Sequence, residues 1–106
     1  MPKFLVQASY TKDGFTGVMG KGGSSRRDAV AQMASELGGQ MESFHFGFGE
    51  YDAYVIVDLP DAESAAAVAL TVNSAGGATT RTVLLLTPEE VDAAAQRSVE
   101  YRPPGS

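Results

Sequence analysis

The sequence has no cysteine and only one histidine. Without cysteine the chain cannot form a disulfide, a thiolate zinc site or a cysteine nucleophile. A single histidine with no pair of carboxylates beside it also argues against a metal site built by the protein. We therefore expect no metal, and no residue pattern in the chain calls for a cofactor.

Basic residues and long apolar runs are scarce as well. Eight lysines and arginines stand against thirteen acidic residues, which gives a net charge of −5. Arg26-Arg27 is the only adjacent basic pair, so we expect no nucleic-acid partner. No run approaches about 18 apolar residues, and no apolar segment follows the first residues, so we expect no membrane span and no signal peptide. The expected location is the cytoplasm.

The length and composition are those of one globular domain. The chain has 106 residues, of which 43% are hydrophobic and 20% are charged. We expect the domain to span residues 1–98. Residues 99–106, which include Pro103-Pro104-Gly105, are expected to form a flexible tail.

Four segments have the pattern of β-strands. Three of them alternate apolar and polar residues, as half-buried strands do. The fourth is a nearly continuous apolar run that suits burial on both faces. The strands are expected at residues 4–10, 41–48, 53–59 and 79–86.

Helix signals lie between these strands and after the last one. Ser25 and Asp61 are placed to cap two helices that Gly38-Gly39 and Gly76-Gly77 terminate. Thr87-Pro88-Glu89-Glu90 is a capping box that opens a short C-terminal helix. The helices are expected at about residues 25–37, 62–74 and 88–97.

Residues 11–23 form a glycine-rich segment that we interpret as a long loop. Its Gly20-Lys21-Gly22 suggests a phosphate-binding loop, but Gly22 stands where that motif needs serine or threonine. A mobile lid or linker over about residues 14–25 is therefore the favoured interpretation.

The resulting order of elements is β-α-β-β-α-β with a terminal helix, which is the ferredoxin-like α+β arrangement around an antiparallel sheet. Two helices can cover only one face of a four-stranded sheet. The other face carries Leu5 and Ile56, and a second copy of the same sheet is the simplest partner for it. We therefore expect a homodimer of the dimeric α+β barrel kind.

The second and third strands are expected to pair as a hairpin. Pairing Phe46 with Val55 aligns phenylalanines with valines on one apolar face, and a one-residue slip would break this match. The same pairing sets Gly47 opposite Tyr54 on the other face and leaves a gap there, close to His45.

That other face gathers polar side chains of the kind that line small-molecule pockets. His45 is the catalytic candidate, because its ordinary pKa near 6.5 suits acid-base chemistry. A histidine that only forms hydrogen bonds in a dimer interface is the alternative. Turn chemistry alone explains Tyr51 and Asp52, which are nevertheless candidates at the hairpin. The candidate ligand-binding residues are Gln7, Tyr54, Asp58, Arg81, Tyr51 and Asp52.

Several short motifs occur together in this chain. They are Tyr10-Thr11, Leu37-Gly38-Gly39, Gly49-Glu50-Tyr51-Asp52, Pro60-Asp61 and Thr87-Pro88-Glu89-Glu90. Over about residues 3–92 they resemble the GYD-domain family, whose signature is a glycine followed shortly by Tyr-Asp at a hairpin. The resemblance implies a small bacterial protein of the dimeric α+β barrel group, from a family with no settled biochemical function.

The sequence therefore leaves two functions open. The first is a homodimer that binds a small molecule in a barrel pocket, and the barrel group includes cofactor-poor oxygenases and isomerases, so the resemblance admits an enzyme of that type. The alternative is a non-catalytic structural or regulatory dimerisation module. A cavity inside the dimer would favour the first, and a dry, filled interface would favour the second.

Overall fold

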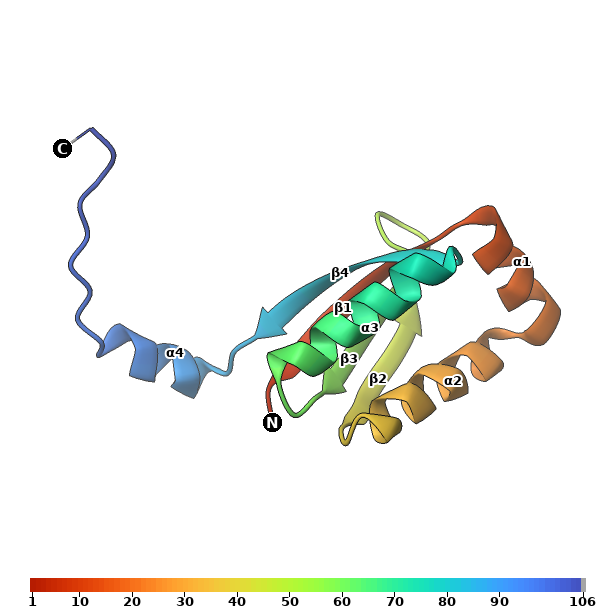
Figure 1. The fold of residues 1–106 in the computed structure, drawn as a ribbon, viewed down its shortest axis with the longest axis horizontal. Coiled ribbons are helices and arrows are strands. Elements are labelled where there is room, and N and C mark those ends of the chain that lie inside the picture. The colour runs from red at the N-terminus through yellow and green to blue at the C-terminus, as the bar shows by residue number, and fades with distance from the viewer. Residues whose placement is uncertain (106) are drawn as a thin grey trace.

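A computed structural model describes residues 1–105 as one four-stranded sheet with helices on one face (Figure 1). The strand order is β2-β3-β1-β4, and every neighbouring pair is antiparallel. This confirms the predicted ferredoxin-like α+β class. No helix within residues 1–105 has the length and apolar character needed to cross a membrane. In chain order the elements are β1 (Lys3–Tyr10), α1 (Lys12–Lys21), α2 (Gly23–Glu36), β2 (Gln40–Phe46), β3 (Ala53–Asp58), α3 (Ala62–Ala75), β4 (Ala78–Leu85) and α4 (Pro88–Ala95).

The core lies between the sheet and the helices on its covered face. There α2 packs against β2 and α3 packs against β4. The alternation of β3 decides which residues enter the core, because Val55 and Val57 are buried while Tyr54 and Ile56, which point to the other face, are only half-buried. The buried cluster consists of Phe4, Ala34, Val55, Val57, Leu59 and Ala65.

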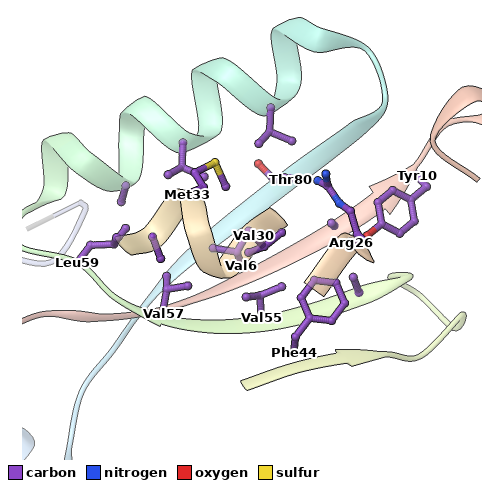
Figure 2. Close-up of a pocket in the computed structure, with 16 residues that line it drawn as sticks. Val6, Tyr10, Arg26, Val30, Met33, Phe44, Val55, Val57, Leu59 and Thr80 are labelled. Atoms are coloured by element: carbon purple, nitrogen blue, oxygen red, sulfur yellow. The ribbon is translucent and has the colours of Figure 1, made fainter. Parts of the chain in front are cut away.

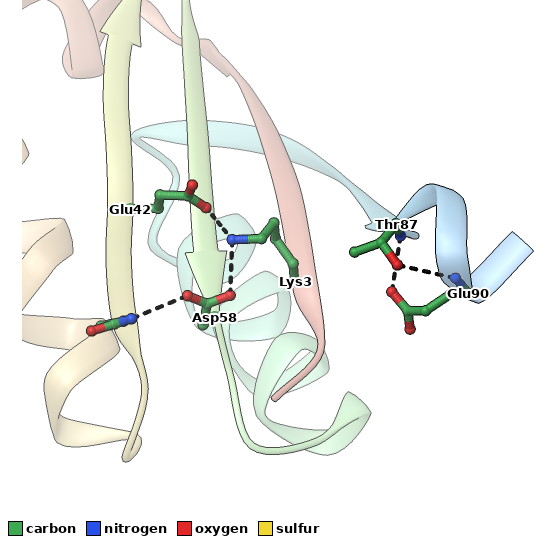
Figure 3. Close-up of polar contacts among 6 residues, drawn as sticks. Lys3, Glu42, Asp58, Thr87 and Glu90 are labelled. Atoms are coloured by element: carbon green, nitrogen blue, oxygen red, sulfur yellow. Dashed lines mark hydrogen bonds and ion pairs between the residues drawn. The ribbon is translucent and has the colours of Figure 1, made fainter.

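The predicted caps of the last two helices are confirmed. The Asp61 carboxylate accepts a hydrogen bond from the backbone N–H of Ser64 at 2.8 Å, and Gly76 ends α3 with a φ of 85°. At α4 the Thr87 hydroxyl accepts from the backbone N–H of Glu90 at 3.1 Å, and the Glu90 carboxylate accepts from that of Thr87 at 2.9 Å (Figure 3). Local sequence signals are sufficient here because each cap involves residues only three apart.

The glycine-rich segment is where the sequence prediction of a long loop is wrong. Residues 12–21 form α1, and α2 starts at Gly23 without the expected cap from Ser25. The reason is non-local: the Thr11 hydroxyl caps α1, and the backbone N–H of Thr11 donates to the Gly77 carbonyl at 3.0 Å. These bonds fix the start of α1 against the end of α3.

The predicted hairpin register is also wrong, by two residues. Phe46 pairs with Ala53 rather than with Val55, so β2 ends at Phe46 and residues 47–52 form the loop. The faces are nevertheless those predicted, because a shift of two residues preserves the alternation. Nearer the start of β2, a β-bulge between Met41 and Ser43 shifts the register of β2 against β3 by one residue.

The sequence predicts that the last strand is buried on both faces, and this prediction is wrong for the single chain. In this single chain β4 is an edge strand, and Val83 and Leu84 are 43% and 54% exposed. After it, α4 projects away from the sheet, and every residue from Leu86 to Gly105 is exposed (Figure 1). Residues 96–105 form no helix or strand, and residue 106 of the predicted tail lies outside the described residues.

Candidate functional site

The sheet register places four of the predicted site residues in one line on the helix-free face. His45 pairs with Tyr54, Tyr54 with Gln7, and Gln7 with Arg81, so the line crosses all four strands. Directly opposed residues on neighbouring strands have Cβ atoms about 5 Å apart, which is within contact range of long side chains. We call these four residues the polar row.

The polar row is open in the single chain. His45 and Arg81 on the outer strands are exposed, and Gln7 and Tyr54 on the inner strands are half-buried. Within the described chain no hydrogen bond joins the four side chains to one another. The row offers an imidazole, a phenol, an amide and a guanidinium group, so it can accept and donate hydrogen bonds and bind an anion.

Tyr54 occupies the space that the sequence prediction left as a gap at Gly47. A Cβ atom added to Gly47 would lie 2.8 Å from Cε1 of Tyr54, so the ring covers this glycine closely. The ring of Tyr51 meets that of Tyr54 edge-on, with 6.2 Å between the ring centroids. The phenol of Tyr54 is therefore held in place by the hairpin loop.

Tyr51 adjoins the polar row, but Asp52 points elsewhere. Tyr51 and Arg81 line one open hollow of about 430 Å³ on the helix-free face, together with Ser9, Thr79 and Glu50. The Asp52 carboxylate instead accepts a hydrogen bond from the backbone N–H of Tyr10 at 2.8 Å. Asp52 thereby fixes the hairpin loop to the end of β1. Thr79 is a lining residue that the sequence does not predict, because its place beside this hollow depends on the pairing of β1 with β4.

Asp58 lies at the opposite end of the helix-free face. It is two residues from Ile56 on β3, and Ile56 separates it from Tyr54 of the polar row. Lys3 donates to Glu42 and contacts Asp58 at 3.2 Å, and the Gln40 amide donates to Asp58 at 3.3 Å (Figure 3). The structure therefore places Asp58 in an ion cluster apart from the other candidates.

The charges of this ion cluster shift the pKa values of its members. The hydrogen bond from Gln40, followed by the contact with Lys3, lowers the pKa of Asp58. The hydrogen bond to Glu42, followed by the one to Asp58, raises the pKa of Lys3. Both groups are thus held in their charged forms at neutral pH.

Between the polar row and the ion cluster runs an apolar line of side chains. Ser43 pairs with Ile56, Ile56 with Leu5, and Leu5 with Val83, so three neighbouring strands contribute large apolar residues. We call Ile56, Leu5 and Val83 the apolar row. Among residues 1–105 no group of three histidine, aspartate or glutamate side chains comes together in a way that could hold a metal ion.

Comparison with known proteins identifies the family. No curated protein and no solved structure matches the chain significantly. The GYD domain matches residues 4–95, which run from the second residue of β1 through the other three strands to the end of α4. On this match over most of its length, the chain belongs to the GYD-domain family.

Proposed function

We propose that the chain forms a homodimer through its helix-free sheet face and binds a small molecule in a pocket lined by the polar row. The observation that carries this proposal is the side-by-side arrangement of the polar row and the apolar row on an uncovered face. The helices cover one face of the sheet, and the large side chains of the apolar row on the other face are stabilised when a further layer covers them.

The surface area of the single chain reflects its extended shape. Its accessible surface is 7289 Å², whereas a compact monomer of 11.1 kDa exposes about 5,700 Å². The projecting residues 86–105, which are all exposed, contribute to this excess of about 1,600 Å². A radius of gyration of 16.7 Å, against about 13 Å for a compact chain of this length, reflects the same extended shape.

A second copy of this chain is the occupant that fits the face best. Two-fold symmetry sets the same patch of each copy against the other, so the patch must complement itself. A two-fold axis close to the apolar row would stack Ile56, Leu5 and Val83 on their own copies. In the ion cluster Lys3 pairs with both Asp58 and Glu42 of its own chain, which leaves one net negative charge at that end of the face.

The polar row defines the chemistry that such a pocket could perform. Arg81 would bind an anionic or carbonyl oxygen of the ligand, and the Tyr54 phenol and Gln7 amide would orient it. His45 would transfer a proton if the bound molecule reacts, since it is the one group of the row that suits this task. The non-catalytic module is the second candidate, and it is favoured by the tight packing of Tyr54 on Gly47.

The dimer is tested by the molar mass of purified chains at micromolar concentration. We expect a dimer for the wild-type chain and a monomer for Ile56→Asp, because an unpaired carboxylate would be buried in the interface. Val83→Asp should also give a monomer, and it provides a second test because Val83 is 43% exposed and tolerates a charge in the single chain. Leu70→Asp on the outer side of α3, where Leu70 is 73% exposed, is the matched control and should remain dimeric. A wild-type monomer, or dimers of both sheet variants, would contradict the proposed interface.

The pocket is tested by native mass spectrometry of the purified dimer and of His45→Gln. We expect the wild-type dimer to retain a small molecule. Glutamine keeps hydrogen-bonding ability but removes acid-base function, so turnover of that molecule should fall at least about tenfold. A dimer that retains nothing and has a dry, filled interface would support the structural module instead. A folded His45→Gln protein with full activity would exclude His45 from the mechanism.

A further inference from the structure

A second hollow region lies on the other side of the sheet, between α1 and α2 on one side and α3 on the other. It consists of a narrow inner hollow of about 50 Å³, shown in Figure 2, and an outer hollow of about 440 Å³. Tyr10, Arg26 and Val72 line both, so the two hollows adjoin. We call this region the inter-helix cleft.

The cleft exists because the floor of the sheet is made of small residues at this end. Ala53 pairs with Ala8, and Ala8 pairs with Thr80, which gives a line of small side chains across three strands. Toward the other end of the same face, the larger side chain of Phe4 is buried between the sheet and the helices. The small side chains at this end therefore leave more room between the sheet and the start of α2, where the outer hollow lies.

Arg26 supplies a polar group to a cleft whose walls are mostly apolar. Figure 2 shows its guanidinium group extending from α2 into the hollow, on the side of Tyr10 and Thr80. Its Nε atom is buried and has no hydrogen-bond partner among residues 1–105. A buried donor of a charged group that lacks a partner is destabilising, and in native proteins such a donor calls for a specific explanation.

The charge of the cleft favours an anion with a single negative charge. Lys21 and Arg26 are positive and Asp13 is negative, and these are the charged residues that line the outer hollow. The Nε edge of a guanidinium group presents two parallel N–H donors that match the two oxygens of a carboxylate. Val18, Val72 and Val30 in the walls would contact an apolar body attached to that carboxylate.

We propose that the inter-helix cleft binds a small carboxylic acid with an apolar body, whose carboxylate pairs with Arg26. This site goes beyond the pocket of the polar row. It lies on the opposite face of the sheet, and one chain forms it alone, so it does not depend on the dimer.

The test uses octanoate as the probe and octanamide as its uncharged counterpart, with binding to the full chain measured by calorimetry. We expect saturable binding of octanoate that is at least about tenfold tighter than that of octanamide. Arg26→Gln should weaken octanoate binding about tenfold and leave octanamide binding unchanged. Arg27→Gln is the matched control, because Arg27 is exposed on the same helix and bonds Asp28 at 3.0 Å, and it should change neither affinity.

A measurement on the wild-type chain keeps the proposal testable if Arg26→Gln does not fold. Octanoate should shift the amide resonances of Ala8, Arg26 and Thr80 in NMR spectra, and the shifts should saturate with the ligand. Absence of saturable binding, or equal affinity for octanoate and octanamide, would overturn the proposal. Shifts confined to His45 and Arg81 would also overturn it and would place the carboxylate on the polar row instead.

Discussion

Removing the carboxylate of Asp52 should destabilise the fold, because this group connects the hairpin loop to the first strand. In Asp52→Ala the backbone N–H of Tyr10 loses its acceptor at 2.8 Å. A hydrogen bond to a charged group contributes about 1.5–3 kcal/mol. Asp52 is half-buried, so water can replace part of the bond, and we expect a loss of about 1–2 kcal/mol in the free energy of unfolding.

Urea and thermal unfolding at one fixed chain concentration measure this loss, since association would otherwise change the apparent stability. A domain of this size loses about 5 °C in Tm per kcal/mol, so the expected decrease is about 5–10 °C. Asp52→Asn should lose less, because its amide oxygen still accepts the bond. Glu50→Ala, in the same loop and exposed, is the control and should stay close to wild type. An Asp52→Ala protein within about 0.5 kcal/mol of wild type would refute the structural role and leave Asp52 to bind a ligand.

Two further predictions concern α1 and the ion cluster. Gly17→Ala should raise the free energy of unfolding by about 0.5–1 kcal/mol, because a Cβ atom there meets nothing within 4 Å and alanine favours helix. Gly14→Ala should lower it, because its Cβ atom would lie 2.0 Å from the Gly77 carbonyl oxygen; the opposite order in urea unfolding would contradict the packing of α1. The lowered pKa of Asp58 contributes stability that is present above its ordinary value of 3.8 and is lost as the pH falls through the folded value. Asp58→Asn should therefore show a flatter decline in Tm between about pH 5 and pH 2, and an unchanged slope would mean that Lys3 and Gln40 do not stabilise the charged form.

Features set by residues close together in the chain could be predicted from the sequence. Asp61 and Thr87 each cap a helix three residues away, and the structure confirms both. The faces of β3 were also predictable, because the alternation of Val55 and Ile56 has a period of two. The family resemblance was carried by such local motifs as well.

Features set by contacts between distant residues could not be predicted. Alternation fixes the face of a strand but not a shift of two residues, and the hairpin register depends on Asp52 reaching β1. The segment that follows Thr11 becomes a helix because Thr11 bonds Gly77, which lies 66 residues away. For the same reason the polar row was anticipated as a set of residues on one face but not as a line across four strands. The place of Arg26 in a cleft could not be predicted either, because the cleft forms only where α1, α2 and α3 pack on the sheet.

The projection of α4 from the sheet has a consequence for its dynamics. An isolated helix shorter than about 12–15 residues is marginal in water, because nucleation is unfavourable. With 8 residues, no buried side chain and only its capping box, α4 cannot remain folded by local interactions alone. Its backbone amides should exchange with solvent deuterium almost as fast as those of an unstructured peptide in a free chain, and much more slowly when another molecule packs on Val91. The end of the chain would then report on association without any change elsewhere in the sheet.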